Sequence, residues 1–193
     1  EAEALSRFQG GLLRLDGLTE LDADTASAIA RSKANTLALN KLRTIDPETA
    51  KSLLQFRGVF HFTAVHETVG QETPLNVDVV KLVCLSANKA PYAVSLPGVT
   101  ALDSPDSIAI AQSLAKRQGP LALPNLKKIS PKTLSALIEK EDIEIPLIET
   151  LELIQEPDGS VTEDFIVPEW LSERERRLKR EQEAELSNAA DSR

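Results

Sequence analysis

One repeated pattern constrains this chain more than any other feature of its sequence. Its clearest copy runs from Leu37 to Leu53 and reads L-x-L-x-x-L-x-x-[IL]-[DS]-P-x-T-[AL]-x-x-[LI]. Six copies of varying completeness are separated by 24, 23, 34, 27 and 22 residues, and they begin at Leu13, Leu37, Phe60, Val94, Leu121 and Ile143. Self-similarity at this period is typical of repeat architectures in which neighbouring units share one core. We therefore expect a stack of similar strand–turn–helix units.

Each position of the pattern has a physical reason. In a short L-x-L strand the two apolar residues point to one side and the residue between them to the other. A residue that can cap a helix follows, and its side chain accepts from free backbone amides; these predicted N-caps are Asp22, Asp46, Ser104 and Ser130. Proline then occupies the first helical position, where its missing N–H costs nothing, at Pro47, Pro105 and Pro131. Apolar residues at helical spacing complete each unit.

The repeat resembles the leucine-rich repeat family in a divergent form, over about residues 12–147. The resemblance implies an α/β solenoid with parallel strands on a concave face, helices on the convex face, and protein partners on the concave side. The usual consensus has Asn or Cys where this chain has Leu18, Leu42, Val65, Val99 and Leu126. The endings Leu96-Pro97, Leu123-Pro124 and Ile145-Pro146 resemble a subclass of bacterial surface proteins, which favours an extracytoplasmic or cell-surface location. A mixed α/β domain with less regular packing is the alternative.

Changes in the residue pattern along the sequence divide the chain into four parts. We expect an N-terminal cap at 1–11, the repeat array at 12–147, a C-terminal β-hairpin cap at 148–168, and a charged helical or disordered tail at 169–193. The long interval in the array predicts an inserted loop at 67–76, followed by a helix at 77–87. Interleaved charges in the tail favour a solvated helix or a linker over a coiled coil.

Composition excludes several classes of function. A net charge of −8 and a pI near 4.9 argue against nucleic acid as a partner, since nucleic-acid binders usually have a basic face. No apolar run reaches the roughly 18 residues that a transmembrane helix needs. The single cysteine, Cys84, lies in an apolar stretch, and we expect a buried thiol. Methionine is absent even at position 1, which indicates a fragment or a processed form.

The sequence offers little catalytic chemistry. Its two histidines, His61 and His66, are five residues apart, and this spacing matches no common zinc site. The phosphate-binding, dinucleotide-binding and G-x-S-x-G motifs are missing, and Gly10-Gly11 is an isolated pair. We therefore predict a protein that is not an enzyme and has no cofactor and no metal.

The outward strand positions are the residues left free to bind a partner. They form two rows: Arg14, Ala38, His61, Ser95, Ala122 and Glu144 in the first, and Asp16, Asn40, Thr63, Pro97, Pro124 and Pro146 in the second. The predicted binding residues are Arg14, Asp16, Asn40, His61 and Thr63, which the inserted loop would extend. The expected function is a non-catalytic scaffold that binds another protein; the alternative is a structural spacer or stalk in a larger bacterial surface protein.

Overall fold

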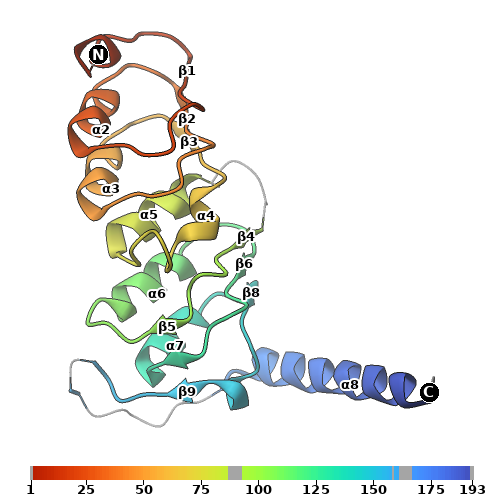
Figure 1. The fold of residues 1–193 in the computed structure, drawn as a ribbon. Coiled ribbons are helices and arrows are strands. Elements are labelled where there is room, and N and C mark those ends of the chain that lie inside the picture. The colour runs from red at the N-terminus through yellow and green to blue at the C-terminus, as the bar shows by residue number, and fades with distance from the viewer. Residues whose placement is uncertain (1, 87–92, 158, 161–166, 192–193) are drawn as a thin grey trace.

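The protein has a mixed α/β fold made of short parallel strands and short helices (Figure 1). The structure is a computed structural model that describes residues 2–86, 93–157, 159–160 and 167–191. Its α-helices are α1 (Ala2–Ser6), α2 (Ala23–Ala30), α3 (Pro47–Leu53), α4 (Val65–Thr68), α5 (Val77–Ser86), α6 (Ser107–Ala115), α7 (Pro131–Leu137) and α8 (Glu169–Asp191). A 3₁₀ turn, η1, spans Ile148–Thr150. The predicted α/β class is confirmed.

The strands form three small parallel sheets. Within the described residues, the first sheet has the order β1-β2-β3, the second β4-β6-β8, and the third β5-β7-β9. Their bounds are β1 Leu12–Arg14, β2 Thr36–Ala38, β3 Val59–His61, β4 Val94–Ser95, β5 Ala101–Leu102, β6 Leu121–Ala122, β7 Lys128–Ile129, β8 Ile143–Glu144 and β9 Glu152–Leu153. The pairing is parallel because a crossover connection, in most cases with a helix, separates each strand from the next strand of the same sheet.

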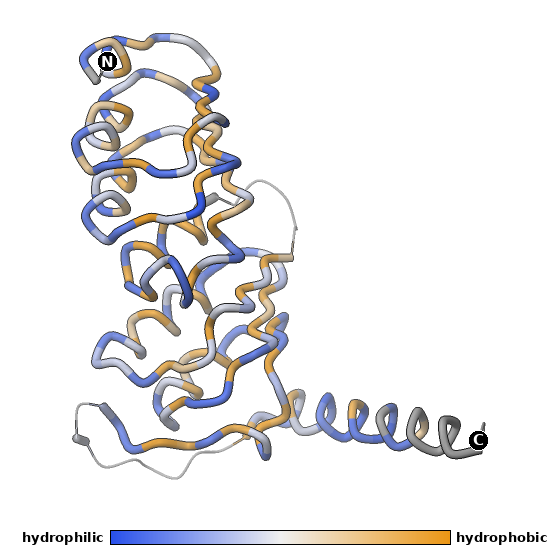
Figure 2. The backbone as a smooth tube through the Cα atoms, in the orientation of Figure 1, coloured by the Kyte–Doolittle hydropathy of each residue, from blue (hydrophilic) through white to orange (hydrophobic). Residues whose placement is uncertain are grey.

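The helices lie on one side of these sheets. Figure 1 shows α2, α3, α5, α6 and α7 following one another along one side of the molecule, with the first and second sheets on the opposite side. Neighbouring helices pack against each other in the order α1, α2, α3, α5, α6, α7. Apolar and polar segments alternate along the tube in Figure 2, as the repeat pattern requires. Successive helices and strands therefore share one apolar core.

The apolar positions of the clearest repeat form the centre of this core. Leu37, Leu39, Leu42 and Leu53 are fully buried, and Ile45 is 1% exposed. Burial of a leucine or isoleucine side chain stabilises the folded state by roughly 1.5–3 kcal/mol. The pattern thus encodes the core directly.

Three of the four predicted helix caps are confirmed. Asp22 and Asp46 accept hydrogen bonds from the backbone N–H groups of Thr25 at 2.8 Å and Thr49 at 2.9 Å. Ser130 accepts from the N–H of Thr133 at 3.4 Å, and Pro47 and Pro131 open their helices as predicted.

The fourth predicted cap, Ser104, is wrong. Helix α6 begins at Ser107 after a turn, so Pro105 is not its first residue. The relation of the two serines is reversed, because the hydroxyl of Ser107 accepts from the N–H of Ser104 at 2.9 Å. Asp106 stands at the helix start without a side-chain capping bond. The buried Ser107 hydroxyl therefore closes this turn from the inside.

The predicted insertion contains a helical turn of its own. Helix α4 (Val65–Thr68) occupies its beginning, and α5 follows at Val77 as the sequence predicts, although position 87 lies outside the described residues. The hydroxyls of Thr68 and Thr73 both donate to the carbonyl oxygen of Arg43, the second at 3.1 Å. Hydroxyl groups thus tie the insertion back to the second repeat.

The predicted C-terminal hairpin lies partly outside the described residues, and the predicted tail begins with a packed turn. Strand β9 pairs in parallel with β7, and the second strand of the predicted hairpin falls largely on 161–166, outside the described residues. The tail is helical as α8, but its first turn is not solvated: Leu171 is 1% exposed and belongs to the core. The side chain of Trp170 packs beside it.

Candidate functional site

The five predicted binding residues lie together on the first sheet. The strand register places Arg14 beside Ala38 and Ala38 beside His61. Adjacent strands are about 4.8 Å apart, so Arg14 and His61 flank Ala38 at about 10 Å from each other. Both flanking side chains are exposed, whereas Ala38 is only 4% exposed. The first three residues of the first predicted row are therefore neighbours, with a buried position in the middle.

The second row is joined by hydrogen bonds into a polar ladder of Asp16, Asn40 and Thr63. The side-chain amide of Asn40 donates to Asp16 Oδ1 at 3.0 Å, and its backbone N–H donates to the same oxygen at 3.1 Å. The hydroxyl of Thr63 donates to Asn40 Oδ1 at 3.0 Å. Three successive repeats are thus linked through their outward side chains.

Arg14 connects the two rows. Its Nε lies 3.5 Å from Asp16 Oδ2, and the arginine side chain is 69% exposed. Such an exposed ion pair stabilises the fold by at most about 1 kcal/mol, so most of the hydrogen-bonding capacity of the guanidinium faces solvent. Around the polar ladder, the groups best placed to meet a partner are therefore the Arg14 guanidinium and the His61 imidazole.

The corresponding rows of the second sheet carry much less chemistry. Ser95, Ala122 and Glu144 are neighbours in the strand register, as predicted. The amide of Asn125 donates to the carbonyl oxygen of Pro97 at 2.8 Å, which is a backbone contact between repeats. A patch for specific recognition is therefore better supported on the first sheet.

The second histidine is removed from this surface. Burial and, to a smaller extent, the positive charge of Arg117 lower the pKa of His66 to about 4, although a hydrogen bond to the backbone of Val83 acts in the opposite direction. Burial also raises the pKa of the Cys84 thiol to about 11. A buried, protonated thiol is an inert group at neutral pH. The predicted buried Cys84 is confirmed.

A pair of buried cations is a feature that the sequence analysis missed. Arg117 is 4% exposed and donates through Nη1 to the carbonyl oxygens of Gly119 at 2.8 Å and Pro120 at 2.9 Å. Lys140 donates to the carbonyl of Arg117 at 2.8 Å and lies 2.5 Å from Asp142. Both residues follow a helix and precede a strand. This shared position in the sequence pattern is the feature from which a common structural role could have been predicted. They hold turns together, and Arg117 also lines an open cavity of about 620 Å³ beside Cys84 and Lys116.

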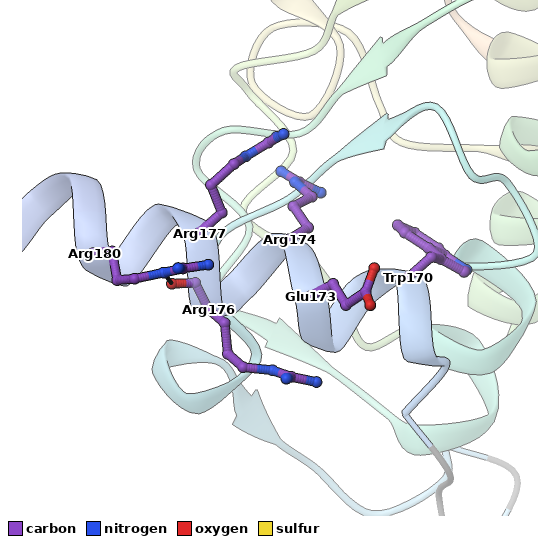
Figure 3. A pocket seen from close by; sticks show the side chains of 6 residues that line it. All are labelled: Trp170, Glu173, Arg174, Arg176, Arg177 and Arg180. Atoms are coloured by element: carbon purple, nitrogen blue, oxygen red, sulfur yellow. Dashed lines mark hydrogen bonds between the residues drawn. The ribbon is translucent and has the colours of Figure 1, made fainter.

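An arginine-rich face on α8 is a second surface that the sequence analysis did not select. Figure 3 shows an open groove along this helix, lined by Trp170, Glu173, Arg174, Arg176, Arg177 and Arg180. Next to it, a groove of about 400 Å³ separates α8 from the second sheet, with Glu141 and Glu144 on the sheet side and Arg177 on the helix side. Charge is therefore concentrated at this end of the molecule.

Features that identify a specific activity are missing from the described parts of the chain. There, no three His, Cys, Asp or Glu side chains are grouped so that they could hold a metal ion. None of the described helices is both long and apolar enough to cross a membrane. In comparisons with known proteins, no family model, no curated protein and no solved structure matches this chain.

Proposed function

We propose that this chain is a non-catalytic scaffold of leucine-rich repeat type that binds another protein. In this proposal the repeats form a solenoid with the sheets on its recognition face and the helices on its back. Two observations support it: the strands of each sheet are in parallel register, and successive helices pack on the opposite side. The repeated caps of α2, α3 and α7 are a further argument for one recurring unit.

The observation that carries the proposal is the pair of aligned outward rows on the first sheet. The polar ladder fixes Asp16, Asn40 and Thr63 in one orientation, which lowers the entropy cost of presenting them to a partner. Arg14 and His61 flank this fixed strip with exposed, charged or titratable groups. A rigid polar strip bordered by an arginine suits a folded protein surface better than an apolar small molecule.

The direct test is capture of partners from the native source with the 193-residue chain, followed by mass spectrometry. A variant that combines Arg14→Ala and His61→Ala should lose the captured protein, because neither side chain is needed for the core. A matched control, Ser95→Ala with Glu144→Ala, changes the same row in the second sheet and should retain it. Equal capture by both variants would contradict binding through the first sheet.

A structural spacer is the second candidate function, and the polar ladder itself favours it. Asp16 accepts hydrogen bonds from the side-chain amide and the backbone N–H of Asn40. With the bond from Thr63, these contacts stiffen three successive repeats without any partner. Under this function the Asn40→Ala variant loses stability and the native source yields no protein whose capture depends on Arg14 or His61. The same capture experiment therefore separates the two functions.

A further inference from the structure

The described side chains at the start of helix α8 attach it to the rest of the protein. Leu171 enters the core, and the guanidinium of Arg174 donates to two backbone carbonyls of the second sheet region. Glu175 accepts from the N–H of Ile148 at 2.5 Å, and Lys179 lies 2.5 Å from Glu149. Beyond these first turns the helix extends away from the stack in Figure 1.

The opposite face carries cations that the chain itself scarcely neutralises. Arg176 and Arg180 share this face with Glu173 at helical spacing and line the groove of Figure 3. Arg177 lies at the border of this face, because it lines both this groove and the groove beside the second sheet. Arg177 Nε is 3.9 Å from Glu181, and both side chains are more than 60% exposed. Arg176 and Arg180 each donate through Nε to a carbonyl one turn earlier, at 3.3 and 3.2 Å. Pairs this exposed leave most of the positive charge available to a partner.

The charge along α8 is divided into two blocks of opposite sign. Residues 174–180, the basic block, contain five cations and one carboxylate. Residues 181–191, the acidic block, contain four carboxylates and no lysine or arginine. Both blocks belong to one continuous helix, Glu169–Asp191. A block of each sign on one straight helix is self-complementary only when two copies run in opposite directions.

We infer that two copies of this chain associate through their α8 helices, antiparallel, with the basic block of each against the acidic block of the other. The contact is isologous, since one two-fold axis near residue 181 relates the blocks. Glu181 and Glu183 are exposed beside Ala184, a small residue that allows close approach of a facing arginine. Antiparallel alignment also opposes the two helix dipoles favourably.

A second copy fits these charges better than nucleic acid does. The chain carries a net charge of −8, so a long polyanion placed on the basic block would also meet the acidic block and the acidic body. At physiological salt the attraction of the basic block reaches only about 8 Å, the Debye length. In an antiparallel pair, the carboxylates of the second copy lie within that distance of the basic block. The arginines of the second copy then lie away from the basic block of the first. A projecting helix with few packed contacts is also marginally stable in water unless it finds a partner.

The test is the mass of the full chain in solution, measured by sedimentation, for charge-altered variants. Wild type should be dimeric, and its affinity should fall at least about tenfold when salt rises from about 0.1 to about 1 M, because the Debye length shortens to about 3 Å. The all-acidic variant has Arg176→Glu, Arg177→Glu and Arg180→Glu. The all-basic variant has Glu181→Lys, Glu183→Lys and Glu185→Lys. Each alone should be monomeric, and an equimolar mixture should form a heterodimer.

A block-exchanged variant that carries all six substitutions controls for folding and net charge. It should dimerise like wild type, and circular dichroism should show the same helix content in all forms. The inference is overturned if wild type is a monomer at low salt, or if the all-acidic variant alone remains a dimer. Capture of a glutamate-rich peptide or of single-stranded DNA by monomeric wild type would overturn it as well, and would assign the arginine face to that ligand.

Discussion

His66 is the residue whose charge depends most strongly on the fold. Burial is the main cause of its low pKa of about 4, compared with an ordinary value of 6.5. Between these two values the unfolded chain binds a proton that the folded protein does not. The contribution of His66 to the free energy of unfolding is therefore fully present above pH 6.5, and it is lost as the pH falls toward 4.

The pH dependence of stability should reveal this histidine. We expect the free energy of unfolding to fall by about 3 kcal/mol more between pH 7 and 4 in wild type than in the His66→Gln variant, because the variant has no imidazole to protonate. Urea titrations at several pH values measure the difference. His61→Gln is the matched control for the substitution itself, since the side chain of His61 is exposed. Identical slopes for wild type and His66→Gln would contradict the assignment.

Asp46 caps the start of α3 with both carboxylate oxygens: Oδ1 accepts from the N–H of Thr49 and Oδ2 from its hydroxyl at 2.7 Å. The Asp46→Ala variant should lose about 1 kcal/mol of stability, because the N–H of Thr49 loses its acceptor. Asp46→Asn keeps an oxygen at this position and should remain within a few tenths of a kcal/mol of wild type. Thermal unfolding followed by circular dichroism distinguishes the two variants. Equal losses would mean that the negative charge, and not the capping bond, is what stabilises α3.

At the scale of an element, the start of α8 closes the edge of the second sheet. The carbonyls of Asp142 and Glu144 accept hydrogen bonds from β6. Because the direction of the carbonyls alternates along a strand, those of Ile143 and Ile145 point to the other side of β8, the edge of this sheet. Arg174 donates to both, at 2.7 and 3.3 Å. Its two nitrogens replace the amides of a next strand, which protects an edge that would otherwise template further pairing.

Removal of this arginine should therefore cost more than removal of a neighbouring one. Arg174→Ala is expected to lower the free energy of unfolding by about 1–3 kcal/mol, since two carbonyls lose charge-assisted hydrogen bonds. Arg176→Ala, on the opposite face of the same helix, should change it by less than about 0.5 kcal/mol. Urea unfolding measures both, and light scattering should detect association through the open edge of Arg174→Ala only. Similar losses in the two variants would show that Arg174 does not act as an edge cap.

At the scale of the whole molecule, two glycines bring the first and second sheet regions together. Gly70 has a left-handed backbone with φ of +86°, and a Cβ on it would lie 2.5 Å from the carbonyl oxygen of Gly98. A Cβ on Gly98 would lie 2.3 Å from the carbonyl oxygen of Val69. These backbones approach so closely that no side chain fits between them. The insertion after β3 thus contacts the segment after β4 directly through backbone atoms, with no side chain between them.

Gly98→Ala should consequently disturb the contact between the two regions. We expect a loss of more than about 1 kcal/mol, because the new methyl group collides with backbone that cannot rotate away. Gly17→Ala is the matched control: nothing lies within 4 Å of its Cβ position, and stability should stay equal or rise by up to about 1 kcal/mol. Calorimetry should also show Gly98→Ala unfolding less cooperatively. A neutral effect of Gly98→Ala would mean that the two regions tolerate a shift.

The candidate site could be predicted only in part from the sequence. The two-residue period of a strand predicts which residues face outward, and the register confirms that Arg14, Ala38 and His61 are neighbours. The hydrogen bonds of the polar ladder could not be predicted, because they depend on the rotation of side chains in adjacent repeats. Neither could the burial of Ala38, which is only 4% exposed although it occupies an outward strand position.

The sequence by itself determined the units of this protein, and the tertiary structure decided how the units meet. Caps such as Asp46 and the buried leucines of the clearest repeat follow from local spacing, because their partners lie within one unit or at the same position of the next. The edge cap by Arg174 and the burial of Arg117, Lys140 and His66 depend on residues far apart in the chain. From the sequence, a charged or titratable side chain is predicted to be exposed. Its burial depends on backbone groups that only the folded chain brings around it.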